Sequence, residues 1–279
     1  TIWFELLILS ISYSQILNWG NVNRLDLKSS KFKSIQLKFH LEKYKLKNKN
    51  YYNEGLFYWR NIILNKFEIF QGKEISGNIL EIGAGTGVSS GYASNFKRVN
   101  KVYALDSSIF AVKNLMPYIH KAQNAKINKI KRVYGTFNNL SKCKIKFNLI
   151  WGTGAFHNSK DLQKTFNECY KKLKNNGYLL ISDMCEPDYL TNYELNKKNF
   201  KVLSNLSRRL KKKITYKTTS DYFRPLNEYI YFAKKTGFEV APYIFSEEFG
   251  IPASDNIFIK KEIYKGHQLN IYNPYFKKI

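Results

Sequence analysis

The chain has 279 residues, a formal net charge of +25, and a composition that is 44% hydrophobic and 24% charged. This length suits one large α/β domain with extensions and is short for two enzymes. The three cysteines and four histidines are scattered without C-x-x-C or metal-ligand spacing, so we expect no disulfide framework, no metal site and a cytoplasmic location.

The positive charge allows two explanations. A strongly basic chain ordinarily indicates nucleic acid or an anionic surface as a partner. Here the basic patches span residues 31–49, 121–146 and 197–217, in a chain also rich in asparagine, isoleucine, tyrosine and phenylalanine. AT-rich coding produces this mixture without selection for binding, and no recognised nucleic-acid module is present. We therefore favour the compositional explanation and keep nucleic acid and peripheral membrane contact as alternatives.

Residues 1–76 are predicted to form a helical extension. Residues 3–17 are apolar, but polar side chains such as Glu5 interrupt them, and the stretch is shorter than the ~20 residues that span a bilayer. We therefore expect a packed amphipathic helix rather than an anchor. Because the first residue is Thr1 and not methionine, we also expect the chain to continue upstream.

An aromatic segment over residues 51–59 lies within this extension. Apolar side chains from Leu56 to Phe67 recur at helical spacing, which predicts that they pack in a core. The alternative is that Tyr51 or Tyr58 covers a ligand pocket and contacts the substrate.

The most informative motif is a turn with three glycines spaced two residues apart. A short apolar strand over residues 79–82 leads directly into Gly83, Gly85 and Gly87. Because glycine lacks a Cβ, such a turn adopts backbone angles closed to other residues and lets a ligand approach the main chain. A dinucleotide fingerprint would need its third glycine at the position of Val88, so the spacing excludes that motif.

A carboxylate ends the next predicted strand, over residues 101–106. Asp106 follows Gly87 by one predicted helix and one strand, the separation expected of an acid that accepts hydrogen bonds from both ribose hydroxyls. The alternative is that Asp106 starts the following helix, with Ser107 and Ser108 as caps. Turn and carboxylate together predict a nucleotide-type ligand.

Strands and helices alternate through the following part of the chain, which predicts a mainly parallel sheet with helices on both faces. The predicted strands are residues 79–82, 101–106, 130–134, 147–151 and 178–182, and the predicted helices are residues 88–97, 109–119 and 160–174. We expect Asn175-Asn176-Gly177 to end the last of these helices through a left-handed glycine.

Residues 184–224 interrupt the alternation and are predicted to form an inserted helical cap. Its many basic residues favour a solvated helix face, with a positively charged lid over an acidic substrate as the alternative. Tyr222 and Arg224, at its end, are candidate substrate or lid residues.

The last part of the chain returns to regular elements. A predicted helix over residues 225–236 ends at Gly237, a strand follows, and residues 255–260 form a final strand. Residues 263–279 are predicted to form a tail.

The string E-x-G-x-G-x-G, formed by Glu81 and the three glycines, resembles the first motif of class I S-adenosylmethionine-dependent methyltransferases. The resemblance extends over residues 77–262. It implies a Rossmann-like, doubly wound α/β fold with a mostly parallel seven-stranded sheet, in which the seventh strand lies antiparallel beside the fifth. It also implies S-adenosylmethionine as the cofactor.

The resemblance assigns the cofactor contacts to positions of this chain. It implies that the turn lies against the methionine part and the ribose, that Asp106 holds the ribose hydroxyls, and that Glu81 acts indirectly by orienting the turn. The predicted cofactor contacts are Glu81, Gly83, Ala84, Gly85, Thr86, Gly87, Asp106, Ser107, Thr136, Phe137, Trp151 and Gly152.

Two positions depart from the family pattern. Methyltransferases often carry G-D-A after the third strand, where this chain has Gly135, Thr136 and Phe137, so we expect Thr136 to hydrogen-bond and Phe137 to pack on adenine. The fourth strand usually reads F-D and here reads Phe147-Asn148, a change of small effect because that aspartate is structural in the family.

The loop after the fourth strand resembles a segment that reads approximately A-F-H-H in small-molecule methyltransferases. There it lies between cofactor and substrate, and here it includes Ala155-Phe156-His157-Asn158. His157 is the candidate catalytic base, because neutral imidazole can accept a hydroxyl proton; the alternative is a histidine that packs at a helix start. Asp183 and Tyr222 are weaker candidates, named for their position.

The sequence thus predicts methyl transfer to a small-molecule, sugar-like or lipid-linked acceptor. No N-P-P-Y or D-P-P-Y string marks base amination. An RNA methyltransferase is the first alternative, because of the charge. A non-catalytic interaction module with a degenerate methyltransferase fold is the second, because Thr136 and Asn148 depart from the pattern.

Overall fold

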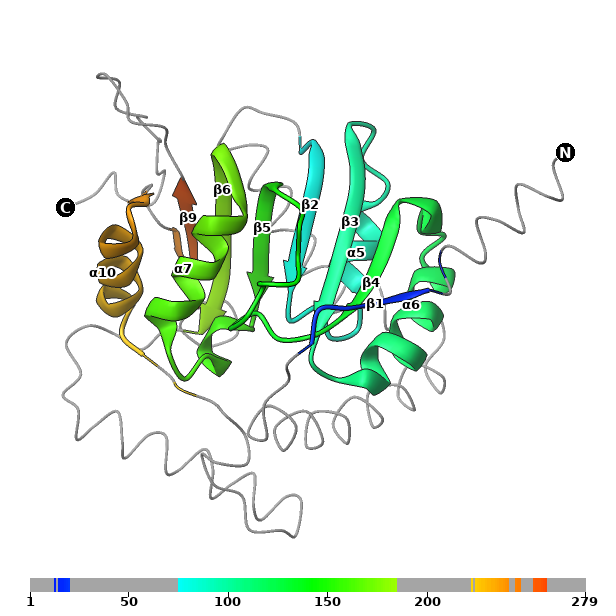
Figure 1. The fold of residues 1–279 in the computed structure, drawn as a ribbon, viewed down its shortest axis with the longest axis horizontal. Helices are drawn as coiled ribbons and strands as arrows, with labels where there is room; N and C mark the ends of the chain where they lie inside the picture. Colours follow the sequence, from blue (N-terminus) through cyan, green and yellow to red (C-terminus); the bar gives the residue numbers. More distant parts are fainter. Residues whose placement is uncertain are drawn as a thin grey trace, which may run out of the picture.

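The computed structural model describes residues 13, 15–20, 75–184, 222, 224–240, 244–246 and 253–259 (Figure 1). The strands in these ranges are β1 (Ile16–Asn18), β2 (Gly77–Ile82), β3 (Val99–Asp106), β4 (Ile130–Tyr134), β5 (Phe147–Thr153), β6 (Leu173–Met184), β7 (Glu239–Val240), β8 (Ile244–Ser246) and β9 (Ala253–Ile259). They form one sheet in the order β1-β4-β3-β2-β5-β6-β9-β7, with β8 paired to β9.

The sheet confirms the expected arrangement of strands. β4, β3, β2, β5 and β6 are parallel neighbours, and β9 lies antiparallel beside β6. The described sheet has nine strands rather than the predicted seven, because β1 and β8 are added. From β2 the chain builds the sheet first on one side, through β3 and β4, and then on the other, through β5 and β6. The strand order thus reverses at β2, which carries the glycine turn at its carboxyl end.

Strand β1 corrects the prediction for the N-terminal extension. The predicted helix over residues 3–17 does not continue through Leu17, because residues 16–18 pair in parallel with β4. An edge strand such as β4 presents unpaired N–H and C=O groups that a further strand can satisfy. Three residues are too few to show a period of two or 3.6, so the sequence pattern could not reveal this strand.

The helical elements are α5 (Val88–Ala93), the π-helical turn η1 (Ala111–Leu115), α6 (Met116–Ala122), the 3-10 turns η2 (Ile127–Lys129) and η3 (Phe156–Asn158), α7 (Leu162–Lys172) and α10 (Leu226–Thr236). α5 is shorter than the predicted helix over residues 88–97. α7 begins after Asp161, whose side chain accepts a hydrogen bond from the Lys164 N–H at 2.9 Å. α10 ends at Gly237 with a φ of 102°, as predicted.

The predicted end of the helix before β6 is wrong. β6 follows α7 without a loop, because Leu173 pairs with Phe147 at the start of β5. The left-handed residue in this segment is Asn176, with a φ of 57°, and not Gly177. A Cβ at Gly177 would lie 2.8 Å from the Lys174 carbonyl oxygen, so glycine serves a close backbone approach here.

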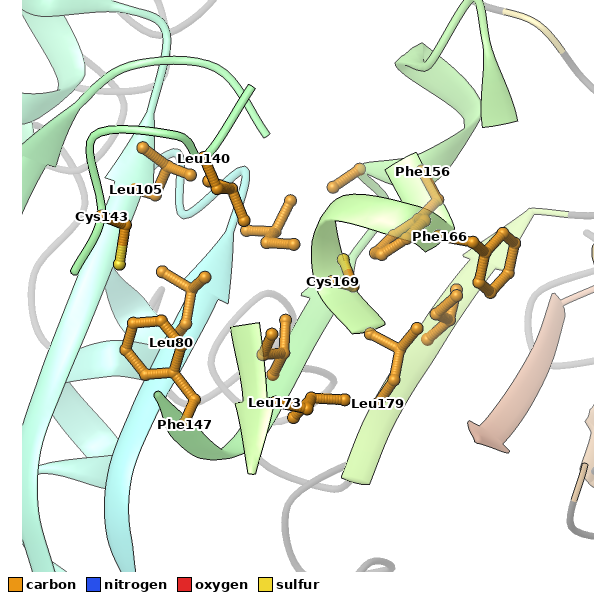
Figure 2. Packing of buried hydrophobic residues seen from close by; sticks show 14 of the residues in the cluster. Leu80, Leu105, Leu140, Cys143, Phe147, Phe156, Phe166, Cys169, Leu173 and Leu179 are labelled. Carbon is orange, nitrogen blue, oxygen red and sulfur yellow. The ribbon is translucent and has the colours of Figure 1, made fainter. Parts of the chain in front are cut away.

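Helices cover both faces of the sheet (Figure 1). Successive side chains of a strand point to opposite faces, so Leu80 of β2 joins the cluster under α7 while Ile79 joins the cluster under α5. Figure 2 shows the first cluster, in which Phe166 and Cys169 of α7 contact side chains from the sheet. This core fixes the strand ends that carry the candidate site.

Several predicted features lie outside the described residues. They are Tyr51 and Tyr58, most of the cap over residues 184–224, and the tail over residues 263–279. Within the described ranges, no helix is long and apolar enough to cross a membrane.

Candidate functional site

The glycine turn after β2 needs its glycines for two reasons. Gly83, Gly85 and Gly87 have φ values of 63°, 53° and 78°, in the left-handed region that disfavours other residues. A Cβ at Gly83 would lie 2.6 Å from the Cβ of Ala155, which belongs to the loop after β5. The turn and that loop therefore pack directly against each other, which brings two predicted cofactor-binding segments together.

Two further residues of the turn are held inside the fold. Ala84 is buried, and its N–H donates to the Leu105 carbonyl oxygen at 2.9 Å. Thr86 is also buried. These contacts attach the turn to β3, so its backbone is a rigid support on which a ligand can rest.

Asp106 lies at the carboxyl end of β3 and is fixed by two backbone groups. Its Oδ2 accepts a hydrogen bond from the Gly85 N–H at 2.8 Å, and its Oδ1 accepts one from the Ser108 N–H at 2.7 Å. Each carboxylate oxygen can accept a second hydrogen bond, so the pair can still bind two hydroxyls. Ser108 also caps the next helix by accepting from the Ala111 N–H, whereas Ser107 is half-buried beside it.

Buried acidic side chains lie together where the parallel strands end. Among the described residues, the buried acidic side chains are Glu81, Asp106 and Asp183, which lie at or near the carboxyl ends of β2, β3 and β6. The carboxyl ends of parallel strands lie on the same side of a sheet. The carboxyl groups of Glu81, Asp106 and Asp183 therefore lie on the side of the sheet that carries the glycine turn.

His157 and Asp183 form a buried pair although 26 positions separate them. His157 Nδ1 lies 2.6 Å from Asp183 Oδ1, and the His157 backbone N–H donates to Asp183 Oδ2 at 2.9 Å. An ionised carboxylate only accepts hydrogen bonds, which assigns the ring proton to Nδ1 and leaves the lone pair on Nε2. That nitrogen accepts from Asn158 Nδ2 at 2.9 Å.

This geometry combines the two interpretations of His157. The residue packs at a helical turn, as the structural alternative required, and 7% of it is exposed. Asp183 nevertheless fixes the ring proton on Nδ1, as in sites where a carboxylate orients a catalytic imidazole. Sequence reasoning named Asp183 only for its position and missed Asn158, which stands at the second histidine of the A-F-H-H string.

The remaining predicted cofactor contacts have strong packing roles. Thr136 is buried, and its Oγ1 accepts a hydrogen bond from the Asn138 N–H at 3.3 Å. Phe137 is half-buried and stacks on Phe156, with ring centroids 6.1 Å apart. Both therefore lie at the carboxyl end of β4 as predicted, but Phe137 already has an aromatic partner in the core.

Trp151 and Gly152 both lie inside β5, which extends two residues beyond the predicted strand over residues 147–151. Trp151 is 1% exposed and belongs to the hydrophobic cluster under α5, so the structure gives it a core position that the prediction of a cofactor contact did not anticipate. A Cβ at Gly152 would lie 2.7 Å from the Phe156 ring, so glycine is needed there for packing. The motif resemblance alone could not separate these roles, because both apolar and ligand-facing residues occupy the end of a strand.

Tyr222 and Arg224 reach the same region from the end of the predicted cap. The Tyr222 N–H donates to the His157 carbonyl oxygen at 2.6 Å. Arg224 binds the Ser159 carbonyl oxygen through Nη2 at 2.7 Å and the Glu228 carboxylate through Nε at 2.9 Å. Arg224 thus anchors the segment before α10 to the loop that carries His157, a structural role beside the predicted contact with substrate.

A second buried histidine, which sequence reasoning left without a role, supports the glycine turn. His120 of α6 is fully buried, and its Nε2 lies 2.9 Å from the Gly87 carbonyl oxygen. Burial lowers the pKa of His120 from 6.5 to about 3, so the imidazole is neutral under ordinary conditions. Only its partners in space reveal this role, because a lone histidine in a helix carries no sequence signal.

The depressed pKa of His120 makes stability pH-dependent. The unfolded histidine binds a proton below about pH 6.5 and the folded one does not, so this contribution is complete above that pH and is lost as the pH falls toward 3. We expect it to lower the free energy of unfolding by about 1.4 kcal/mol between pH 7.5 and pH 5.5. Urea denaturation of the wild type and His120→Gln would measure it; equal losses in both proteins would contradict the assignment.

Comparisons with known proteins agree with this architecture. A family model described as a methyltransferase domain matches residues 74–236, more than half of the 279 residues. No curated protein gives a significant match. A proposed sarcosine dimethylglycine methyltransferase from Galdieria sulphuraria superposes with a TM-score of 0.55 at 19% identity, with 72% of this chain and 85% of that chain covered.

Two further solved structures were determined with a cofactor or its product. Phosphoethanolamine N-methyltransferase 2 of Haemonchus contortus, in complex with S-adenosyl-L-methionine, has a TM-score of 0.52 at 15% identity, covering 72% of this chain and 53% of that chain. Magnesium protoporphyrin IX methyltransferase from Synechocystis PCC 6803, with bound SAH, has a TM-score of 0.51 at 11% identity, covering 87% and 90%. At such identities these structures establish the fold, and the family match establishes membership. The chain therefore belongs to the class I S-adenosylmethionine-dependent methyltransferases, which are transferases with S-adenosylmethionine as cofactor.

Proposed function

We propose that this methyltransferase acts on a small-molecule acceptor, with His157 as the base that removes the acceptor proton. The observation that carries the proposal is the buried pair of His157 and Asp183 at the sheet edge that also holds the glycine turn and Asp106. A base that is 7% exposed suits an acceptor small enough to enter the fold. The buried carboxylates at the same edge would repel a phosphodiester backbone, which disfavours RNA.

The residues at this edge are compatible with S-adenosylmethionine. The cofactor supplies an electrophilic methyl group on a positively charged sulfur. The backbone of the turn from Gly83 to Gly87 would lie against its methionine part and ribose, and Asp106 would accept the ribose hydroxyls with its remaining lone pairs. The carboxyl groups of Glu81 and Asp183 lie on the same side of the sheet and offer further hydrogen-bond acceptors to the ligand.

The chain's own groups then have defined tasks in the transfer. His157 Nε2 accepts the proton of the acceptor hydroxyl or amine, and Asp183 stabilises the imidazolium that forms. To reach Nε2, the acceptor replaces the hydrogen bond that Asn158 Nδ2 makes to it. The acceptor would give its proton to His157 and take the methyl group that the cofactor supplies, and the proton would stay on His157. Alignment of the two reactants can contribute about 7–11 kcal/mol of barrier lowering besides.

A substrate screen at two salt concentrations tests the class of acceptor. The intact protein would be incubated with methyl-labelled cofactor and either a small-metabolite extract or total RNA, at low and at moderate ionic strength. We expect label in small molecules, with turnover changed less than about twofold by salt. RNA binding through several phosphate contacts would weaken by orders of magnitude over that range. Label confined to RNA and lost with salt would contradict the proposal in favour of the nucleic-acid alternative.

A further inference from the structure

A tyrosine from the N-terminal extension is seated on the far side of the glycine turn. The Tyr13 hydroxyl lies 2.7 Å from His120 Nδ1, and Arg132 Nη2 donates to the Tyr13 carbonyl oxygen at 2.8 Å. The Arg132 guanidinium also lies over the Tyr13 ring, 4.6 Å from its centroid. Three separate interactions therefore hold one residue against α6 and β4, although Tyr13 and His120 are 107 positions apart in the chain.

His120 transmits this contact to Gly87 through its two ring nitrogens. The Gly87 carbonyl oxygen can only accept, so His120 Nε2 carries the proton and donates to it at 2.9 Å. Nδ1 then holds the lone pair and accepts from the Tyr13 hydroxyl, which burial keeps protonated by raising the pKa of Tyr13 to about 12. The docked tyrosine thus supplies the donor that the Nδ1 lone pair needs when Nε2 donates to Gly87.

His120 packs closely against Gly87. A Cβ at Gly87 would lie 2.6 Å from His120 Nε2 and 3.0 Å from Met116 Cγ, so the imidazole fills the space that a side chain would take. The Gly87 N–H in turn donates to Ala84 at 2.9 Å across the turn. A shift of the His120 ring would therefore move the backbone on which the cofactor is proposed to lie.

We propose that Tyr13 and His120 are positioning residues that hold the third glycine of the cofactor turn, so that the contact of Tyr13 with His120 strengthens the binding of S-adenosylmethionine. The inference rests on the proposed cofactor position at this turn. Without the Tyr13 hydroxyl, the Nδ1 lone pair is buried without its donor. The alternative tautomer would then remove the His120 donor from the Gly87 carbonyl oxygen, which the Gly91 N–H and Ser90 Oγ also bind at 2.9 and 3.0 Å. Because coupling between sites is reciprocal, bound cofactor should also favour the docked tyrosine.

The experiment compares Tyr13→Phe with a matched control, Tyr118→Phe, which removes a hydroxyl from a partly exposed tyrosine on the same helix as His120. Calorimetry with S-adenosylhomocysteine and steady-state kinetics would be measured on the intact protein. We expect Tyr13→Phe to raise the Kd for S-adenosylhomocysteine and the KM for S-adenosylmethionine about threefold to fivefold, a loss of the size of one hydrogen bond. The kcat at saturating cofactor and the KM for the acceptor should stay within twofold, and Tyr118→Phe should match the wild type.

A second pair of variants separates positioning from folding. His120→Leu removes the donor to Gly87, whereas His120→Gln restores a donor amide at a similar distance, so we expect the glutamine variant to recover most of the affinity that leucine loses. A lower thermal midpoint with unchanged cofactor affinity in Tyr13→Phe and in both His120 variants would overturn the inference. Absence of binding by the wild type would instead overturn the proposed cofactor position, and the inference with it.

Discussion

Replacing His157 with glutamine should lower kcat by about two to four orders of magnitude, the usual contribution of a general base. Glutamine is similar in size and polarity but cannot take up a proton, so the acceptor would have to react in its protonated form. The Kd for S-adenosylhomocysteine should stay within about twofold, because the His157 ring hydrogen-bonds Asp183 and Asn158, which lie outside the glycine turn. Single-turnover methyl transfer with saturating cofactor measures the chemical step directly.

Asp183→Asn is the partner experiment, because Asp183 binds both the ring and the backbone N–H of His157. An asparagine at this position can hydrogen-bond the ring but neither fixes the proton on Nδ1 nor stabilises an imidazolium, so we expect kcat to fall by up to about four orders of magnitude. The double variant should be little worse than His157→Gln alone, since both residues serve one function. A His157→Gln enzyme with kcat within threefold of the wild type would show that alignment alone drives the transfer.

Replacing Asp106 with alanine should weaken binding of S-adenosylhomocysteine about tenfold to a hundredfold, the loss expected for two charge-assisted hydrogen bonds. The Gly85 and Ser108 N–H groups would also lose the oxygens that they now bind. The effect should appear in the Kd and in the KM for the cofactor, with a smaller change in kcat. Calorimetry on the folded variant gives the Kd directly.

Asp161→Ala provides the matched control for this measurement. Asp161 is an exposed carboxylate that caps α7 through the Lys164 N–H, so its removal should cost about 0.5–2 kcal/mol of stability without changing cofactor affinity. If Asp106→Ala binds the product as tightly as this control, the ribose assignment is wrong. Tight binding would then have to come from the turn backbone alone.

The sequence predicted the sheet well because each strand carries a local signal. Residues 130–134 form β4 with the predicted bounds, and the glycine stop at Gly237 ends α10 as expected. The predictions failed where a distant partner decides the backbone. The chain after α7 enters β6 at Leu173 because Phe147 pairs with it, which overrides the turn signal of the following asparagines and glycine.

In the candidate site too, the features with a local sequence signal were predicted and those that depend on distant residues were not. The spacing of Glu81, the glycines and Asp106 indicated the family and its cofactor from the sequence alone, because a strand, a tight turn and a carboxylate are fixed by neighbouring residues. The motif could not show that Trp151 enters the core under α5, since burial depends on what covers each face of the sheet.

Only the tertiary structure brought the distant polar residues together. His157 meets Asp183 because β5 and β6 are neighbours in the sheet, and Tyr13 meets His120 because β1 adds to the edge of β4. Strand order and edge pairing depend on the packing of the whole chain, which no local spacing encodes. The sequence by itself determined the family and most strands and predicted the cofactor turn, whereas the fold decided that His157 pairs with Asp183 and that His120 contacts Gly87.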